Sequence, residues 1–237
     1  MFENKYSNFL TILLVIVIIA IVGCLAFGGY KVYQQFNSTK EAGDYVNKFQ
    51  EDKNNNKNNN KNNTNTEVDK NEEQEGNNND ALNQVQNTPG GNGGASSGGN
   101  NQTYKGFTVI GTIEIPKINL SYPILKEAST AAIERSVAML YGVGPNNPGN
   151  TLIIGHNYRN GQFFANNKNL SIGDKVYITD LSGKRLSYTI YDKFETTKED
   201  TEFITRNTNG AREISLQTCT DDGSLRLIIL ANCDLDS

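Results

Sequence analysis

The sequence predicts a mainly β domain, a barrel or a sandwich, that follows an N-terminal transmembrane helix and a disordered linker. Three observations predict this order: an apolar run near the N-terminus, a long Asn- and Gly-rich middle, and a C-terminal part made of short β-like runs. The expected boundaries are 1–36 for the anchor and its flank, 37–103 for the linker and 104–237 for the globular domain. With 22 Lys and Arg against 26 Asp and Glu, the net charge is −4. The composition gives no basic footprint, which argues against nucleic-acid binding.

Residues 9–27 read FLTILLVIVIIAIVGCLAF, where Thr11 is the only plainly polar side chain. As a helix this run spans about 28 Å, close to the hydrocarbon thickness of a bilayer. A cleaved signal peptide is the alternative, because residues 26–28 resemble a cleavage site, but the apolar part of such a peptide normally has only about 7–15 residues. We therefore expect an uncleaved single-pass anchor that contacts membrane lipid through residues 9–27.

The linker contains almost no large apolar side chains, and about a third of residues 51–103 are Asn. Such a segment cannot offset the entropy of ordering its backbone, so we expect it to be disordered. It either acts as a leash for the domain or is a low-complexity insertion without functional consequence. A short helix is compatible with residues 30–50, before this composition begins.

The globular part shows seven β-like runs, at 107–115, 120–125, 151–154, 175–179, 185–192, 213–218 and 225–231. Several alternate with period two, as Ile113 with Ile115 and Val176 with Ile178 do, which is typical of strands with one buried face. Residues 128–138 form the best helix candidate, and a short helical turn is expected near 162–166.

Three residue types in this part can carry chemistry. His156, the only histidine, follows the apolar run 151–154, although a lone histidine is more often structural than catalytic. Cys219 ends another expected strand and opens into a polar turn, where a thiol is accessible. Arg226 lies just inside the last apolar run, and it would face Cys219 if the two strands form a hairpin.

These residues resemble the sortases, cysteine transpeptidases anchored outside the membrane of Gram-positive bacteria. The sequence LQTC at 216–219 is similar to the family's nucleophile motif, PGNTLIIGH at 148–156 is similar to its histidine region, and Arg226 stands at its arginine position. The resemblance covers about residues 107–232 and implies an eight-stranded sortase-type β-barrel. The short chain resembles single-domain enzymes of class D or class A.

The resemblance implies that Cys219 cleaves a Leu-Pro-x-Thr-Gly-like sorting signal between Thr and Gly through a thioester, and that an amine then resolves it. His156 would transfer protons, and Arg226 would stabilise the oxyanion with a backbone N–H near Thr220. Thr218 and Leu216 would support the substrate pocket. The expected partners are surface proteins that carry such a signal and an amine of peptidoglycan or pilin.

This chemistry places the catalytic domain outside the cell membrane, although the lysines that flank the apolar run do not favour that orientation. No cofactor is expected. Some sortases use calcium, and four loop carboxylates could contribute to such a site, but their composition is more typical of a solvated loop. These carboxylates belong to Glu195, Glu199, Asp200 and Glu202.

Two other functions remain open at this point. L,D-transpeptidases also use Cys, His and Arg on a β-rich domain in the cell wall, but their Ser-His-Gly-Cys motif is absent here. A non-catalytic tethered module that binds the wall or a protein is the alternative from a different class.

Overall fold

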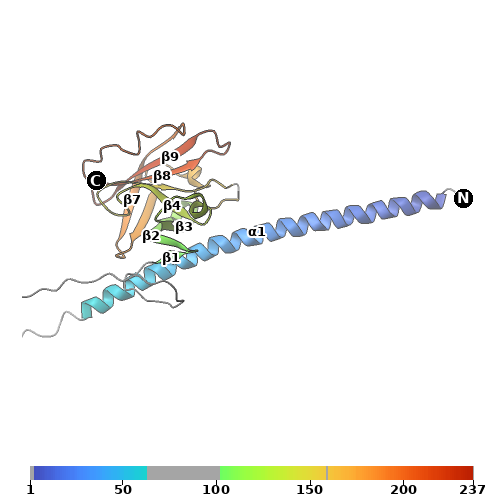
Figure 1. Cartoon of the computed structure of the whole chain (residues 1–237), viewed down its shortest axis with the longest axis horizontal. Helices are drawn as coiled ribbons and strands as arrows, with labels where there is room; N and C mark the ends of the chain where they lie inside the picture. Colours follow the sequence, from blue (N-terminus) through green and yellow to red (C-terminus); the bar gives the residue numbers. More distant parts are fainter. Residues whose placement is uncertain (1–2, 63–101, 159, 237) are drawn as a thin grey trace, which may run out of the picture.

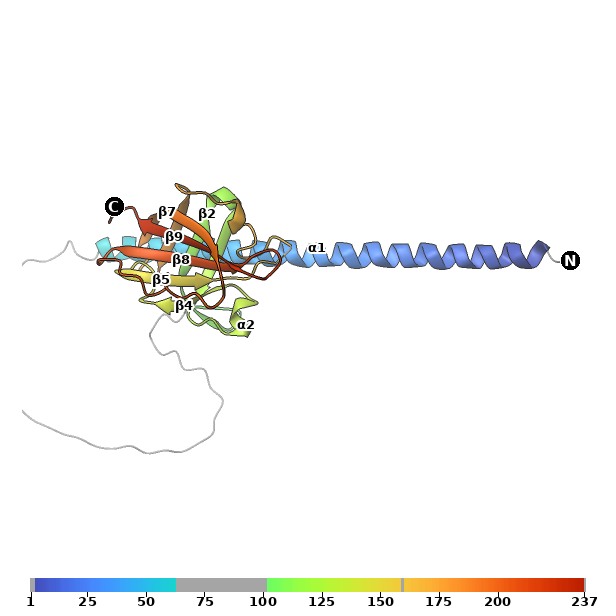
Figure 2. The same ribbon diagram turned by 90° about the horizontal axis from the view of Figure 1, so that it is seen from above.

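The computed structural model describes residues 3–62, 102–158 and 160–236. One long helix, α1 (Glu3–Asn62), precedes a barrel of β-strands, and the barrel lies beside the C-terminal half of the helix (Figures 1 and 2). The strands are β1 (Thr103–Tyr104), β2 (Phe107–Ile115), β3 (Leu120–Leu125), β4 (Val137–Gly142), β5 (Gly149–Ile154), β6 (Lys175–Asp180), β7 (Arg185–Thr196), β8 (Arg212–Cys219) and β9 (Arg226–Cys233). The short helical elements are η1 (Pro116–Ile118), α2 (Thr130–Ile133) and η2 (Asn167–Asn169).

The sheet closes on itself. Its strand order is β1-β2-β3-β4-β5-β8-β9-β7-β6, and β6 pairs back onto β2. Eight strands therefore form the closed barrel, and the two-residue β1 extends β2 outside the ring. The expectation of a mainly β, eight-stranded barrel with few helices is confirmed.

The barrel core follows from the period-two alternation of the strands. Ile113, Ile115, Val176 and Ile178 are buried as expected and belong to one hydrophobic cluster. Closure also requires a close approach of two backbones, because a Cβ added at Gly111 would lie 2.6 Å from the carbonyl oxygen of Thr179 on the paired strand β6. Only glycine leaves room for this strand contact.

The helix expected at 128–138 is wrong over most of its length. Only α2, a single turn capped by the Ser129 side chain, is helical there. Val137 and Ala138 instead begin β4 and pair with Ile124 and Leu125 of β3. Tertiary pairing overrides the local helical pattern, because these residues fill a position between β3 and β5 that the barrel needs to close.

The first part of the expected linker is also helical. α1 continues to Asn62, so residues 37–62 do not form a disordered segment, whereas residues 63–101 lie outside the described residues. Ala42, Val46 and Phe49 recur on one helix face and are at most 2 % exposed, packed on the barrel. Burial of this face stabilises the helix that was considered for residues 30–50, and the helix continues to Asn62 through residues whose composition does not predict it.

The N-terminal half of α1 is long and apolar enough to cross a membrane, by length and composition. Its side chains from Phe9 to Phe27 are exposed in the part of the chain that the structure describes. This arrangement is compatible with the anchor that the sequence predicts.

A buried asparagine joins several strands and turns at the end of the barrel where β8 begins. The Asn146 amide donates to the Lys184 carbonyl at 2.7 Å and to the Asp180 carboxylate at 3.0 Å. Its side-chain oxygen accepts from the buried Tyr188 hydroxyl at 3.0 Å, and its carbonyl accepts from the Arg212 side chain at 3.1 Å. Asn146 also adopts a left-handed backbone, φ 61°, which asparagine tolerates better than most residues.

Substitution of Asn146 by alanine should destabilise the barrel. The change leaves the buried Tyr188 hydroxyl without its acceptor and places alanine in a left-handed conformation, so we expect the free energy of unfolding to fall by about 2–4 kcal/mol. Urea unfolding of the detergent-solubilised chain measures this loss. The matched control is Asn147→Ala at the exposed neighbouring position, expected to cost less than about 1 kcal/mol. Equal losses in the two variants would contradict this account of Asn146.

Candidate active site

Cys219 and Arg226 face each other across a hairpin. Cys219 is the last residue of β8, Arg226 is the first residue of β9, and the two are paired in the antiparallel register. The Thr220 N–H donates to the Leu225 carbonyl at 3.1 Å and closes the turn between them. Both Cys219 and Arg226 are partly exposed, so a thiol and a permanent cation lie together at one end of the barrel.

His156 reaches the same place from β5. This strand runs parallel to β8, with Ile154 opposite Gln217. Beyond the strand, the Gly155 N–H donates to the Gln217 carbonyl at 3.2 Å, and the Thr218 hydroxyl donates to the Gly155 carbonyl at 2.8 Å. Continued by two residues beyond Ile154 and Gln217, the same register places His156 beside Cys219.

Asn157 holds the histidine segment against the cysteine. Its amide donates to the Cys219 carbonyl at 2.9 Å and to the Asp221 carboxylate at 3.0 Å. Asp221 also forms an ion pair with Lys168, N to O 2.8 Å. The sequence reasoning missed Asn157, and its position directly after His156 is the only signal that would have singled it out.

Burial and one carboxylate act in opposite directions on His156. Desolvation lowers the pKa of its imidazole, and the negative charge of Glu134 raises this pKa, with desolvation the larger effect. Part of the burial comes from Tyr158, whose ring stacks on the imidazole at 4.7 Å between centroids and 14° between planes. The neutral form of His156 is therefore favoured more strongly than in a free histidine.

Tyr158 belongs to a series of contacting aromatic rings. The Tyr158 ring contacts Phe163 at 5.6 Å, and Phe163 contacts Tyr122 at 5.3 Å between centroids. The Phe163 N–H donates to the Tyr122 hydroxyl at 3.3 Å, and Phe163 has a left-handed backbone, φ 54°. These contacts fix the loop that carries His156, and neither Tyr158 nor Glu134 was singled out from the sequence.

A cavity of 330 Å³ opens beside the thiol. Cys219, Thr218 and Leu227 line it together with the turn 220–222. Glu195, near the end of β7, also lines it. Most of the side chains that line this cavity are polar.

The remaining expected site residues occupy different positions. Thr218 lines the cavity and is buried, with its hydroxyl committed to Gly155. Leu216 is fully buried in the barrel core, so this position does not support a direct contact with substrate. A backbone N–H near Thr220 is expected to help stabilise an oxyanion, and that of Thr220 itself is already bonded to the Leu225 carbonyl.

The loop carboxylates considered for calcium do not gather. Asp200 accepts hydrogen bonds from the Thr196 hydroxyl and the Glu202 N–H, and these bonds lower the pKa of its carboxyl group. Across residues 3–62, 102–158 and 160–236 there is no group of three or more His, Cys, Asp and Glu side chains that could hold a metal ion. The expectation that no cofactor is needed stays a prediction.

Comparison with known proteins places this geometry in a family. A model of the Sortase domain matches residues 113–234, a range that contains His156, Cys219 and Arg226. The chain belongs to the sortase family. Membership in the sortase family argues against the L,D-transpeptidase alternative.

Individual sortases are similar over part of their length. Sortase A of Bacillus anthracis is 30% identical over 124 residues, which are 51% of this chain and 58% of that protein, less than two thirds of its length. The solved structure of a lid mutant of Sortase A from Corynebacterium diphtheriae is 29% identical and has a TM-score of 0.50, covering 54% of this chain and 70% of that one. A Sortase D5 transpeptidase of Clostridium perfringens is 29% identical with a TM-score of 0.49, covering 53% and 79%.

Two substitutions should shift the pKa of His156 in opposite directions. Tyr158→Ala exposes the imidazole, so its pKa should rise, whereas Glu134→Gln removes a negative charge, so the pKa should fall further. Because His156 is the only histidine, its ring proton resonances in an NMR titration are assigned without ambiguity. Shifts of the same sign in both variants would show that the balance described here is wrong.

Proposed function

We propose that this sortase is a membrane-anchored cysteine transpeptidase that cleaves a Leu-Pro-x-Thr-Gly-like sorting signal between Thr and Gly. The observation that carries the proposal is the convergence of Cys219, His156 and Arg226 at the ends of three neighbouring strands, β8, β5 and β9. A nucleophile, a proton carrier and a fixed cation are the groups that acyl transfer needs, and the Cys219 nucleophile lines a cavity of 330 Å³.

The reaction begins with transfer of the Cys219 thiol proton to the His156 imidazole. The thiolate sulfur attacks the Thr carbonyl carbon, and collapse of the tetrahedral intermediate breaks the Thr–Gly C–N bond. The imidazolium gives its proton to the leaving Gly amine, and a thioester remains on Cys219. An acceptor amine then attacks the thioester carbonyl and transfers its proton to His156 as the Cys219 thiolate leaves, so an amide replaces the thioester.

Burial of His156 affects these steps in two ways. A lowered pKa makes the imidazolium a stronger acid, which favours protonation of the leaving amine. The same lowering reduces the fraction of enzyme in the thiolate–imidazolium state at neutral pH. Glu134 offsets part of the second effect by stabilising the positive charge.

Arg226 supplies the charge for the oxyanion in this proposal. One guanidinium nitrogen donates to the Leu225 carbonyl at 3.1 Å, which restrains the side chain beside Cys219. With the Thr220 N–H occupied in the turn, Arg226 is the principal donor that the described site offers to the developing negative charge.

The loop between β7 and β8 is proposed to contact the substrate. It starts after Thr196, which pairs with Arg226, and so leaves the sheet next to the site. Phe203 is buried with Leu152, Ile228 and Leu230 on the outer face of the barrel. Arg206 bonds to Glu213, Ser215 and the Phe203 carbonyl, so the loop is held in a defined shape.

The proposed location is the cell membrane, with one span through residues 9–27 and the barrel outside. The proposed partners are surface proteins that carry the sorting signal, and the acceptor is an amine of peptidoglycan or of a pilin. The length and apolar composition of the N-terminal half of α1 support the anchor.

Purified full-length chain in detergent should cleave members of a quenched Leu-Pro-x-Thr-Gly peptide library between Thr and Gly. Added hydroxylamine should give a hydroxamate on Thr, because it intercepts the thioester. Cys219→Ala should abolish both products, whereas Cys24→Ala, at an exposed position in α1, should retain them. Mass spectrometry identifies the products, and parallel reactions with EDTA test the expectation that no metal is needed.

Two outcomes would count against the transpeptidase. Cleavage by Cys219→Ala would show that another group is the nucleophile. No cleavage of any library member by a folded chain with a titratable thiol would favour the tethered, non-catalytic binding module.

Arg226→Lys should lower kcat by roughly 100-fold, because lysine keeps the charge and loses the planar fork of donors that arginine presents. Arg185→Lys is the matched control, since this exposed arginine pairs with Glu114 away from the site and should keep its activity. Steady-state kinetics on the preferred peptide measure both. A kcat of Arg226→Lys within about threefold of the original enzyme would remove Arg226 from oxyanion stabilisation.

A further inference from the structure

α1 connects the apolar N-terminal run to the barrel without a break. The helix extends from Glu3 to Asn62, and it therefore includes both residues 9–27 and the segment that packs on the barrel. Figures 1 and 2 show its N-terminal half projecting beyond the barrel as a straight extension of the docked half. A continuous helix transmits position and orientation from one end to the other, which a flexible linker does not.

The docked segment of α1, residues 32–53, carries both apolar and polar contacts with the barrel. Ala42, Val46 and Phe49 are buried in the interface, and the Tyr45 ring meets Tyr104 edge to face at 5.1 Å. Polar contacts flank this apolar strip. The Glu41 carboxylate pairs with Lys105 at 3.0 Å, and the Gln50 amide donates to Glu114 at 2.5 Å.

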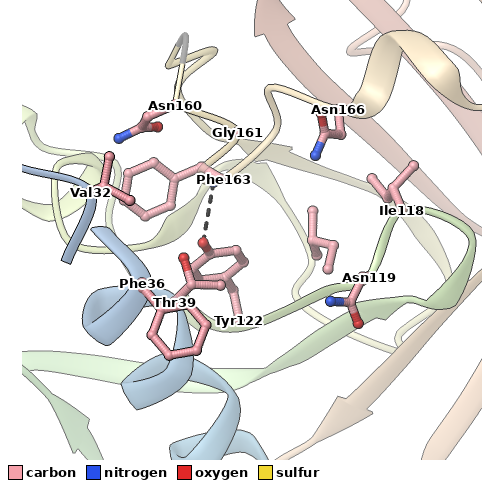
Figure 3. A pocket seen from close by; sticks show the side chains of 11 residues that line it. Val32, Phe36, Thr39, Ile118, Asn119, Tyr122, Asn160, Gly161, Phe163 and Asn166 are labelled. Carbon is pink, nitrogen blue, oxygen red and sulfur yellow. Dashed lines mark hydrogen bonds between the residues drawn. The ribbon is translucent and has the colours of Figure 1, made fainter. Parts of the chain in front are cut away.

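The contacts also fix which end of the barrel faces the apolar run. Val32, Phe36 and Thr39 of α1 enclose a 460 Å³ cavity with Asn160, Gly161 and Phe163, which belong to the loop that follows His156. Figure 3 shows Phe163 and Tyr122 of the barrel facing these helix residues, joined by their hydrogen bond. The helix segment nearest to the apolar run therefore meets the catalytic end of the barrel.

The far end of the docked segment meets the opposite end of the barrel. A Cβ added at Gly183, in the turn between β6 and β7, would lie 2.7 Å from the Lys53 Cβ. The C-terminus also lies on this side, where Asp236 pairs with Arg212 at the start of β8 (Figure 2). Since Cys219 ends β8, the thiol lies toward the N-terminal side of α1.

Helix geometry gives the height of this end above a membrane. With a rise of about 1.5 Å per residue, Val32 lies about 7 Å and Thr39 about 18 Å beyond Phe27 along the helix axis. The residues between Asn62 and Gln102 join two parts of one packed body, so their length does not set the distance from the apolar run to the barrel.

We propose that α1 is a rigid strut that holds the active site facing the membrane at a fixed height, on the order of 10–20 Å above the bilayer. The inference rests on the proposed membrane anchor and peptidase activity, and it replaces the leash considered for the linker. Its consequence is a geometric limit on substrates: the scissile peptide of a membrane-anchored substrate must lie within this interval.

The test changes the height and keeps the orientation. Eighteen residues of Ala-, Glu- and Lys-rich helix inserted between Gly29 and Tyr30 add five whole turns, about 27 Å, and return the helix to the same rotational phase. The matched control carries an 18-residue Gly- and Ser-rich insertion after residue 80. Each full-length chain is reconstituted in liposomes with a transmembrane substrate whose sorting signal lies close to the bilayer, and each is also assayed on a soluble peptide in detergent.

The helix insertion should lower the rate on the anchored substrate at least tenfold, because the reacting groups no longer share the same height. An equal helical extension of the substrate should restore the rate. The insertion after residue 80 should change neither assay, and the soluble-peptide rate should be the same in all three chains, which also shows that the barrel is folded. A Gly- and Ser-rich insertion of 18 residues after Gly29 should accept both the short and the extended substrate.

Other results overturn specific parts. Two results would contradict the rigid strut and favour a flexible tether. One is an anchored-substrate rate after the helix insertion that stays within twofold of the original rate, and the other is a changed rate after the control insertion. If the original chain shows no activity on the soluble peptide, the proposed function is contradicted instead. A chain that fails to float with liposomes would reject the membrane anchor, so these failures are distinguishable.

Discussion

The parallel register between β5 and β8 is the constraint on which the rest of the site depends. Ile154 opposite Gln217, and the Gly155 hydrogen bonds to Gln217 and Thr218, bring His156 level with Cys219. A slip of one residue would turn every side chain of a strand to the other face of the sheet. The register is protected against such a slip because Leu152 and Leu216 are fully buried on opposite faces of the sheet, Leu216 in the barrel core and Leu152 in the outer cluster.

The antiparallel register of β8 and β9 places the Arg226 guanidinium beside Cys219. The pairing of Cys219 with Arg226 leaves a turn of six residues, which the bond from Thr220 to Leu225 closes. Asn157 then ties this turn to the histidine loop through the Cys219 carbonyl and Asp221. Backbone geometry thus positions the three reactive groups, and side chains outside the reacting set hold the backbones together.

The aromatic rings around His156 have two effects on its imidazole: they orient the ring, and they remove it from water. The stack with Tyr158 and the support from Phe163 and Tyr122 orient the imidazole, and the accompanying desolvation disfavours its charged form. Glu134, on the turn after α2, opposes this effect from a solvent-exposed position. Phe163 and Tyr122 of this aromatic series border the cavity shared with α1, so α1 and the histidine loop are neighbours in the fold (Figure 3).

The sequence by itself determined the β class of the domain and the apolar run at 9–27, because alternation and the length of an apolar run are local signals. It also indicated that His156, Cys219 and Arg226 lie at strand ends, whereas their candidate roles came from the resemblance of their motifs to the sortases. Tertiary structure decided what depends on distant partners. Val137 and Ala138 form a strand because β3 and β5 flank them, and residues 37–62 are helical because Ala42, Val46 and Phe49 find the barrel surface. Asn157, Tyr158 and Glu134 act through contacts with segments that no spacing reveals, and the direction in which the active site faces follows from how α1 docks.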